Sequence, residues 1–407
     1  MNGKRRAADR EEILRLFDLP GYEIVEVETE DGWCTLFLKQ KAVGFRCPGC
    51  RRKGVEHRST RWRGVRDLDL MARHVVLQVP VYRILCRECG MREGSVKIAR
   101  RFARCTKRLE RDLFALTKYM TVKAVADRTK LDWRAVKDAE VRHIRALLRK
   151  RKVTGVRRIG IDEVSYQKRH RYLTLVTDLD GHRVIYATFR NDGGSVRRFL
   201  RWFGPERSAR LTVVVTDMHQ PFIKVIRKQL PNAALVFDHF HVSKLIHDAI
   251  DAIRRRLQRD LSKEDREVIK GKRWVLLIAK ENLSEKQQVS LAELMEMNAE
   301  LAAAYILKED FRWAFKAKAR KAGEKRLGRW EGRARESGIP EFQKILQTIK
   351  RRREGIMNFF EYQVANGMAE GFNNVVGTIR KQAYGFHDRD YLRLKVLRVC
   401  GKLDESH

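Results

Sequence analysis

Two pairs of cysteines constrain the amino-terminal part of the chain more than any other feature. Cys47 and Cys50 form one CxxC pair, and Cys86 and Cys89 form the second. The two-residue gap within a pair lets both thiolates point at one metal ion. Two such pairs joined by a β-rich segment predict a structural zinc site with four thiolate ligands. A redox pair is the alternative, but it does not need a second pair.

The segments around these cysteines alternate between apolar and polar residues. We expect strands at residues 22–27 and 35–38, separated by a turn at 31–32, and a further strand at 74–82 that leads into the second pair. Because this small domain has little core of its own, zinc binding is expected to contribute to its folding free energy. Its arginines are expected to contact the DNA backbone, unless the module only docks other domains: Arg46, Arg51, Arg52, Arg58, Arg61 and Arg63.

The charge of the chain indicates its class of partner. There are 88 Lys and Arg residues against 52 Asp and Glu, and the formal net charge is +36. Such a surface attracts polyanions, of which nucleic acid is the most abundant in a cell, although a merely solvated surface is the alternative. The apolar runs are far shorter than the roughly 20 residues of a membrane span, and residues 1–10 hold no secretory apolar region. We therefore expect a cytoplasmic, nucleoid-associated protein that binds no membrane.

Residues 105–150 have the pattern of a helix-turn-helix. Residues 106–119 are amphipathic, a short helix is expected at 121–128, and Asp132 is a good N-cap for a helix that begins at Trp133. Six residues form its predicted core: Val122, Val125, Ala126, Leu131, Trp133 and Val136.

Two basic residues of this segment are candidates for reading DNA. Arg134 and Lys137 lie in the first turns of the second helix of the motif, where base edges are met. A plain helical linker is the alternative.

From residue 156 the pattern changes to strands that carry or end in acids. Five strands and two intervening helices are expected, in the order strand, strand, strand, helix, strand, helix, strand, which is the order of an RNase H-like fold. The predicted strands are 158–166, 171–178, 184–190, 210–217 and 233–238, with helices at 195–203 and 221–230.

Three acids are the candidates for catalysis. Asp162 lies in the first of these strands and Asp217 ends the fourth, its neighbour in such a sheet, so that their carboxylates can converge. Glu370, on a later helix, is the candidate third acid. Pairs of hard divalent ions, ~3.5–4 Å apart, need several carboxylate ligands, and they catalyse in-line displacement at phosphorus.

The helix that carries Glu370 has one polar face. By helical spacing, Glu370 shares this face with Asn373, Asn374 and Lys381, and we expect a surface for metal and DNA there. Asn373, Asn374, Arg380 and Lys381 are the predicted DNA contacts.

Other acids have ordinary alternatives. Asp238 and His241 are candidate neighbours of the active site, and local structural hydrogen bonding is the alternative. Glu163 is expected to face the side of the strand opposite to Asp162.

The joint pattern of these motifs resembles a known family. In order, the chain holds the two CxxC pairs, the helix-turn-helix, Gly-Ile-Asp162-Glu, Val-Val-Thr-Asp217-Met, Phe-Asp238-His-Phe-His241-Val and Ala-Glu370-Gly-Phe-Asn-Asn-Val-Val-Gly. This order resembles the bacterial insertion-sequence DDE transposases of the zinc-ribbon group called ISL-three, over nearly the whole chain. Each short motif alone is weak, but the combination is specific.

The resemblance implies an activity and its cofactors. Asp162, Asp217 and Glu370 would be a catalytic triad that binds two Mg²⁺ ions, with Mn²⁺ as a substitute. The amino-terminal domains would bind the terminal inverted repeats of an insertion sequence. The enzyme would cut the DNA ends and join their 3′-hydroxyls to target DNA, as a homodimer that pairs two ends. A DNA-binding regulator with an inactive nuclease fold and a structure-selective nuclease or resolvase remain as alternatives.

The expected architecture is therefore multidomain α+β. It comprises a zinc-ribbon domain with a preceding β-hairpin (1–104), a helix-turn-helix domain (105–150), an RNase H-like catalytic core in two parts (151–244 and 346–407) and a helical insertion (245–345). One hypothesis for the insertion is that Trp274, Trp313 or Trp330 stacks on an unpaired base. A solvated helical scaffold with these rings in its core is the alternative.

Overall fold

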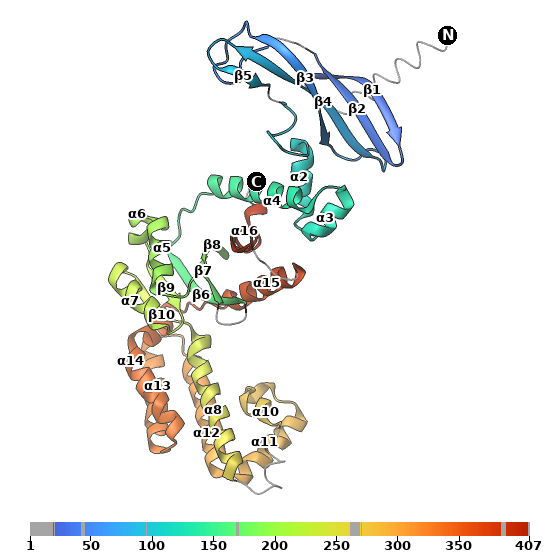
Figure 1. Ribbon diagram of the computed structural model, residues 1–407. Helices are drawn as coiled ribbons and strands as arrows, with labels where there is room; N and C mark the ends of the chain where they lie inside the picture. Colours follow the sequence, from blue (N-terminus) through green and yellow to red (C-terminus); the bar gives the residue numbers. More distant parts are fainter. Residues whose placement is uncertain are drawn as a thin grey trace. The chain divides into compact units, whose positions relative to one another are not determined.

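The structure, a computed structural model, describes residues 19, 21–41, 45–94, 96–167, 171–260, 269, 271–383 and 388–405. The first ten residues, on which the expectation about a secretory signal rests, lie outside these ranges. The chain divides into two compact units, residues 1–150 and 151–407, which are described separately (Figure 1). None of the helices in the described ranges is long and apolar enough to cross a membrane.

A twisted five-stranded sheet forms the first part of unit 1. Its order is β1-β2-β4-β3, and β5 also pairs with β4. The strands are β1 (Tyr22–Glu30), β2 (Trp33–Gln40), β3 (Glu56–Arg66), β4 (His74–Cys86) and β5 (Gly90–Glu93). The predicted hairpin turn is confirmed, since Asp31 and Gly32 take positive φ angles of 38° and 80° between β1 and β2. The core on one face consists mainly of Leu and Val residues from β2 and β4.

Three helices complete unit 1 and confirm the helical prediction. They are α2 (Lys107–Leu116), α3 (Val122–Thr129) and α4 (Trp133–Lys150). Asp132 begins α4 as predicted, because its carboxylate accepts the Arg134 backbone N–H at 2.8 Å. Val125, Ala126 and Val136 are buried in the common core. Trp133 is not a core residue, since 48% of it is exposed at the first position of α4.

The sheet of unit 2 has the predicted RNase H-like topology. Its strands are β6 (Arg158–Gln167), β7 (Arg171–Asp178), β8 (Arg183–Thr188), β9 (Val213–Thr216) and β10 (Ala234–Phe237). Their order is β10-β9-β6-β7-β8, in which β6, β7 and β8 are antiparallel while β9 and β10 run parallel to β6. The central strand β6 therefore lies beside β9, as the sequence predicted.

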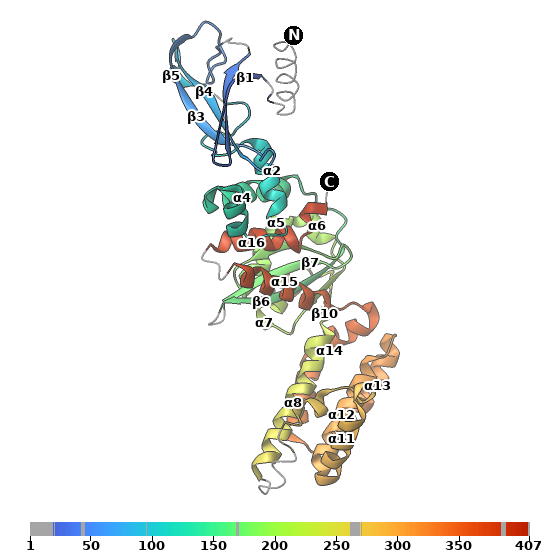
Figure 2. The same ribbon diagram turned by 90° about the vertical axis from the view of Figure 1, so that its right-hand side faces the viewer.

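Helices cover both faces of this sheet. Phe199 of α5 (Gly193–Phe203) and Phe222 of α7 (Gln220–Gln229) pack in one core with Ile161 of β6. The short helix α6 (Pro205–Ala209) follows α5. On the other face, α15 (Met368–Gln382) contacts β6 and α16 (Arg389–Val399) contacts β8 (Figure 2).

The segment between β10 and α15 is helical, as predicted. It holds α8 (His239–Asp260), α10 (Arg273–Leu277), the 3₁₀ turn η1 (Lys280–Asn282), α11 (Glu285–Met297), α12 (Ala299–Phe315), α13 (Arg320–Glu336) and α14 (Pro340–Tyr362). Residues 291–308 are divided between α11 and α12. Asn298 marks the division, because its side chain accepts the Leu301 backbone N–H and begins α12.

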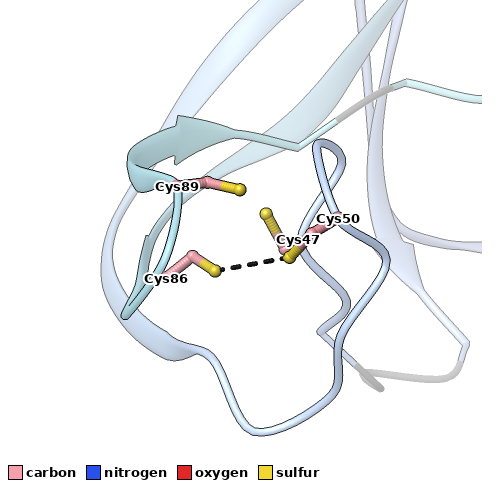
Figure 3. A group of neighbouring side chains, drawn as sticks. All are labelled: Cys47, Cys50, Cys86 and Cys89. Atoms are coloured by element: carbon pink, nitrogen blue, oxygen red, sulfur yellow. Dashed lines mark hydrogen bonds between the residues drawn. The ribbon is translucent and has the colours of Figure 1, made fainter.

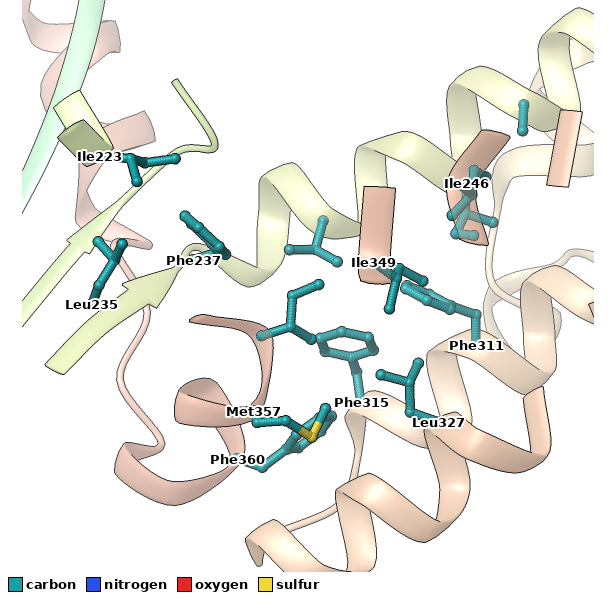
Figure 4. Packing of buried hydrophobic residues seen from close by; sticks show 14 of the residues in the cluster. Ile223, Leu235, Phe237, Ile246, Phe311, Phe315, Leu327, Ile349, Met357 and Phe360 are labelled. Atoms are coloured by element: carbon teal, nitrogen blue, oxygen red, sulfur yellow. The ribbon is translucent and has the colours of Figure 1, made fainter. Parts of the chain in front are cut away.

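One hydrophobic core runs from the sheet into these helices (Figure 4). Phe237 of β10 belongs to the same buried cluster as Phe311, Leu327 and Phe360. A Cβ at residue 355 would lie 2.5 Å from the Phe237 ring, so that only glycine lets α14 approach β10 this closely. The insertion is therefore packed continuously with the sheet that carries the candidate acids.

Candidate active site and metal centre

The four predicted cysteines form a compact site in unit 1 (Figure 3). Cys47 and Cys50 lie in the loop before β3, Cys86 ends β4, and Cys89 lies in the turn before β5. Their sulfur atoms all lie within 4.8 Å of one another, and the Sγ atoms of Cys50 and Cys86 are 3.6 Å apart. This is the donor set of a tetrahedral zinc site.

Two glycines shape the turns around these sulfurs. A Cβ at residue 49 would lie 3.2 Å from the Cys89 Sγ and 3.6 Å from the Cys47 Sγ, so a side chain there would crowd the site. Gly90 takes a positive φ of 67° in the tight turn beside the second pair, a conformation that glycine adopts without steric cost.

The thiols influence one another's proton affinities. The Cys50 backbone N–H, followed by that of Gly49, lowers the pKa of Cys47 to about 6. Hydrogen bonds with the Cys50 and Cys47 side chains raise the pKa of Cys89 to about 12. Cys47 and Cys89 thus hold their protons with different affinities, and a metal ion that binds the thiolates would replace these protons.

In unit 2, the pairing of two parallel strands brings together two of the predicted acids. Ile161 of β6 lies opposite Thr216 of β9, so Asp162 and Asp217 are the next residues of the two strands. Asp217 follows the end of β9, where its carboxylate accepts the His219 backbone N–H at 3.1 Å. Burial, together with the Asp217 charge, raises the pKa of Asp162, while the Asn373 amide acts to lower it.

Glu163 belongs to the same acidic cluster, although the sequence interpretation assigned it no role. Burial raises its pKa to about 8, and the charges of Asp217 and Asp162 act in the same direction. The side chain of Asn191 is a hydrogen-bond partner, but the buried Oε1 has none among the described residues. Strand alternation puts residues 162 and 163 on opposite faces of β6. Because β9 ends beside these two residues, Asp217 lies close to both carboxylates. The signal that could have indicated this is the pair of adjacent acids, Asp162 and Glu163, within the predicted strand 158–166.

Glu370 lies in the first turn of α15 and is exposed. Asn373, one turn later, donates from Nδ2 to the Asp162 Oδ2 at 3.0 Å. Helical spacing suggested that Asn373 shares a polar face with Glu370. In the structure, Asn373 does not lie on the exposed face that carries Glu370. It lies on the half-buried side of α15, with Ala369 and Val376 buried beside it.

The three predicted catalytic acids are not placed as a single metal-binding group. In the described part of the chain, the four cysteines are the only group of three or more Cys, His, Asp or Glu side chains placed to hold a metal ion. Asp162 and Asp217 are neighbours, and the helix of Glu370 is hydrogen-bonded to Asp162, but the three carboxylates do not form such a group. Their joint role remains a prediction.

The two candidate neighbours of the acids occupy different positions. Asp238 is buried after β10, where its carboxylate accepts the Phe240 N–H at 3.3 Å at the beginning of α8. This is local structural hydrogen bonding. His241 is close enough to Asp162 that its charge acts to lower the Asp162 pKa.

The predicted DNA contacts occupy several surfaces. Arg134 and Lys137 lie 5.6 and 5.9 Å from the centroid of the exposed Trp133 ring. Asn374 and Lys381 are exposed on α15, while Arg380 donates to the Ser165 carbonyl oxygen at 3.1 Å.

Comparisons with known proteins identify the class to which this fold and its cysteine site belong. Residues 159–396 match the family described as a transposase of the ISL3 type. Residues 44–89 match the zinc finger of the transposases of IS204, IS1001, IS1096 and IS1165, and residues 95–144 match the helix-turn-helix domain of transposase family ISL3.

Two relatives extend the match over almost the whole chain. The transposase for insertion sequence element IS1001 of Bordetella parapertussis is 31% identical over 401 residues, which cover 95% of this chain and 97% of that protein. The transposase for IS1557 of Mycobacterium tuberculosis is 30% identical over 389 residues, which cover 89% and 87% of the two chains. The chain therefore belongs to the ISL3 family of insertion-sequence transposases.

Proposed function

We propose that this transposase binds the terminal inverted repeats of an insertion sequence, cleaves the DNA ends by Mg²⁺-dependent hydrolysis and joins the 3′-hydroxyl ends to target DNA. The observation that carries the proposal is the position of Asp162 beside Asp217, with the helix of Glu370 hydrogen-bonded to Asp162. We place the protein at the nucleoid, where its substrate is found.

The side chains around Asp162 fit hard divalent cations. Besides the carboxylates of Asp162 and Asp217, the buried oxygens Glu163 Oε1, Asn366 Oδ1 and Asn373 Oδ1 have no hydrogen-bond partner among the described residues. Oxygen atoms of this kind are the ligands that Mg²⁺ prefers. Asn366 lies against Gly160, two residues before Asp162, where a Cβ would meet its Oδ1 at 2.4 Å.

Each acid would have a defined part in the chemistry. Asp162 and Asp217 would hold the cations at the ends of two rigid strands, and Glu370 would complete the set from α15. Bound divalent cations activate the attacking water or 3′-hydroxyl and stabilise the leaving oxygen. Phosphoryl transfer of this type depends on positioning and charge, so these side chains need form no covalent bond with the DNA.

Unit 1 supplies the surface for end binding in this proposal. Arg134 and Lys137 at the start of α4 would meet base edges, and the arginines of the ribbon would contact phosphates. Because two ends must be paired, we propose that the active form is a homodimer.

The experiment uses purified full-length protein and labelled DNA that carries the repeats flanking its coding region. Cut and joined products are scored in Mg²⁺, in Mn²⁺ and without a divalent cation. We expect Asp162→Asn, Asp217→Asn and Glu370→Gln to abolish cleavage while end binding persists. Cleavage without joining would favour a nuclease or resolvase, and binding without cleavage by the wild-type protein would favour a regulator.

A matched pair of variants tests the helix-turn-helix. Arg134→Ala should weaken binding to the repeats by about 1–3 kcal/mol if it reads a base edge. Arg149→Ala, which changes a basic residue in the last turn of the same helix, should have a smaller effect. Equal losses for the two variants would contradict recognition by the start of α4.

A further inference from the structure

The hydrogen bond between Asn373 and Asp162 links two elements that are 211 positions apart in sequence. Asn373 belongs to α15, the helix that also carries Glu370, and Asp162 is the acid on the central strand β6. Asn373 is half-buried, and its Oδ1 is buried without a partner in the described part of the chain.

We propose that Asn373 is a positioning residue for the predicted catalytic acids and not a DNA contact: its amide orients the Asp162 carboxylate and holds α15, the helix that carries Glu370, against β6. This inference rests on the function proposed above. It replaces the DNA-binding role that the sequence pattern suggested for Asn373.

The chemistry of the site favours an amide at this position. Asp162 lies beside Asp217 at the end of β9 and next to Glu163 in β6, so that carboxylates already gather here. An amide donor at 3.0 Å from the Asp162 Oδ2 adds no further negative charge to these carboxylates. A hydrogen bond from the amide also fixes which oxygen of Asp162 remains available for a cation.

Helix geometry then transmits this contact to Glu370. Residues three apart lie on neighbouring positions of a helix, with a rise of roughly 4.5 Å between them. Arg380 makes a second attachment, two turns further along, to the Ser165 carbonyl oxygen of β6. Ala369, Val376 and Ile379 are buried along the same helix. Of these attachments, the Asn373 contact is the one that reaches a catalytic acid.

The test separates cation binding from DNA binding in the full-length protein. Mn²⁺ is the probe, and its affinity is measured by titration without DNA, while end binding is measured separately in the absence of divalent cations. We expect Asn373→Ala to weaken Mn²⁺ binding about 10- to 100-fold, the usual effect of removing a residue that orients a metal ligand. End binding should stay within about twofold of wild type.

Two other variants on α15 complete the design. Asn374→Ala, at an exposed position, should leave Mn²⁺ affinity unchanged and weaken end binding. Thr378→Ala, also exposed, should change neither. If Asn373→Ala does not fold, Asn373→Leu removes the donor while filling a similar volume, and the same result is expected of it.

Distinct results would overturn the two proposals. Wild-type Mn²⁺ affinity with weakened end binding in the Asn373 variants would make Asn373 a DNA contact and reject the inference. Failure of the proposed function would appear differently, as a wild-type protein that binds repeat DNA but neither cuts nor joins it in Mg²⁺.

Discussion

Asp67 and Arg108 form an ion pair that joins the zinc-ribbon sheet to the helix-turn-helix within unit 1. Asp67, directly after β3, is fully buried, and its Oδ1 accepts from the Arg108 Nε at 2.8 Å and from the Thr106 hydroxyl at 2.6 Å. Because Thr106 also caps α2, the first helix begins at this carboxylate. The ribbon and the helices are thus held in a fixed relation inside one unit.

Replacement of this buried carboxylate should destabilise unit 1. Asp67→Ala leaves Arg108 without its main partner and should lower the free energy of unfolding by about 3 kcal/mol, as for other broken buried pairs. The effect is measured by urea denaturation of the full chain, with zinc release as the signal of unfolding. Asp127→Asn breaks the exposed pair with Lys123 and should change the free energy by less than about 1 kcal/mol. Equal effects would show that the Asp67 network does not stabilise the unit.

Zinc should be a structural component of the ribbon. Cys47→Ser or Cys86→Ser removes one of four ligands, so metal analysis of the pure variant should show loss of zinc and a lower melting temperature. Cys34→Ala, which changes a buried cysteine outside the site, should retain zinc. Wild-type protein that contains no zinc would contradict the assignment.

Zinc binding should also fail at acid pH, because the thiols must lose their protons to bind the ion. The pKa of Cys47, lowered to about 6, means that this sulfur loses its proton at a lower pH than Cys89, whose pKa is raised. Zinc release followed with a coloured chelator across a pH series would measure this dependence.

Glu163 should make the cation-free protein less stable as the pH rises. Its folded-state pKa of about 8 lies above the usual value of 4.5, so its contribution is fully present below about pH 4.5 and is lost as the pH rises through 8. Glu163→Gln should therefore raise the melting temperature relative to wild type at pH 8 and lose that advantage near pH 4. Both proteins keep their zinc and are measured in buffer free of Mg²⁺. A difference that does not vary with pH would show that the carboxylate is not destabilised in the fold.

The tryptophans of the helical insertion should divide into two classes. Trp330 is 1% exposed and donates from its indole N–H to the Leu307 carbonyl oxygen at 2.8 Å, so it cannot stack on a base. Trp330→Ala should cost about 3–5 kcal/mol of stability. Trp313 is 43% exposed, with the Arg326 guanidinium 4.1 Å from its ring centroid, and Trp313→Ala should cost far less. Chemical denaturation compares the two, and equal losses would reject this division.

Much of the site followed from local patterns in the sequence. The cysteine spacing predicted the four-sulfur cluster, and the order of the strands placed Asp162 beside Asp217. These features depend on short-range spacing and on a known strand order. Strand β3 was not predicted as a strand, because its polar and mostly exposed residues lack apolar alternation.

Features that depend on tertiary packing were not predictable. Trp133 is apolar and was assigned to the core, but the first position of α4 leaves it exposed. Helical spacing grouped Asn373 with Glu370, because residues three apart share a broad face. The docking of α15 on β6 then decides which of them is covered, and the sequence holds no local signal for that docking.

The central claim is that Asp162, Asp217 and Glu370 together hold two divalent cations. The most direct measurement is the anomalous scattering of Mn²⁺ in crystals of the full-length protein bound to repeat DNA. We predict two Mn²⁺ peaks, ~3.5–4 Å apart, with ligands from both aspartates and from Glu370. Peaks bound by Asp162 and Asp217 while Glu370 stays on the exposed side of α15, or no peak at these residues, would contradict the claim.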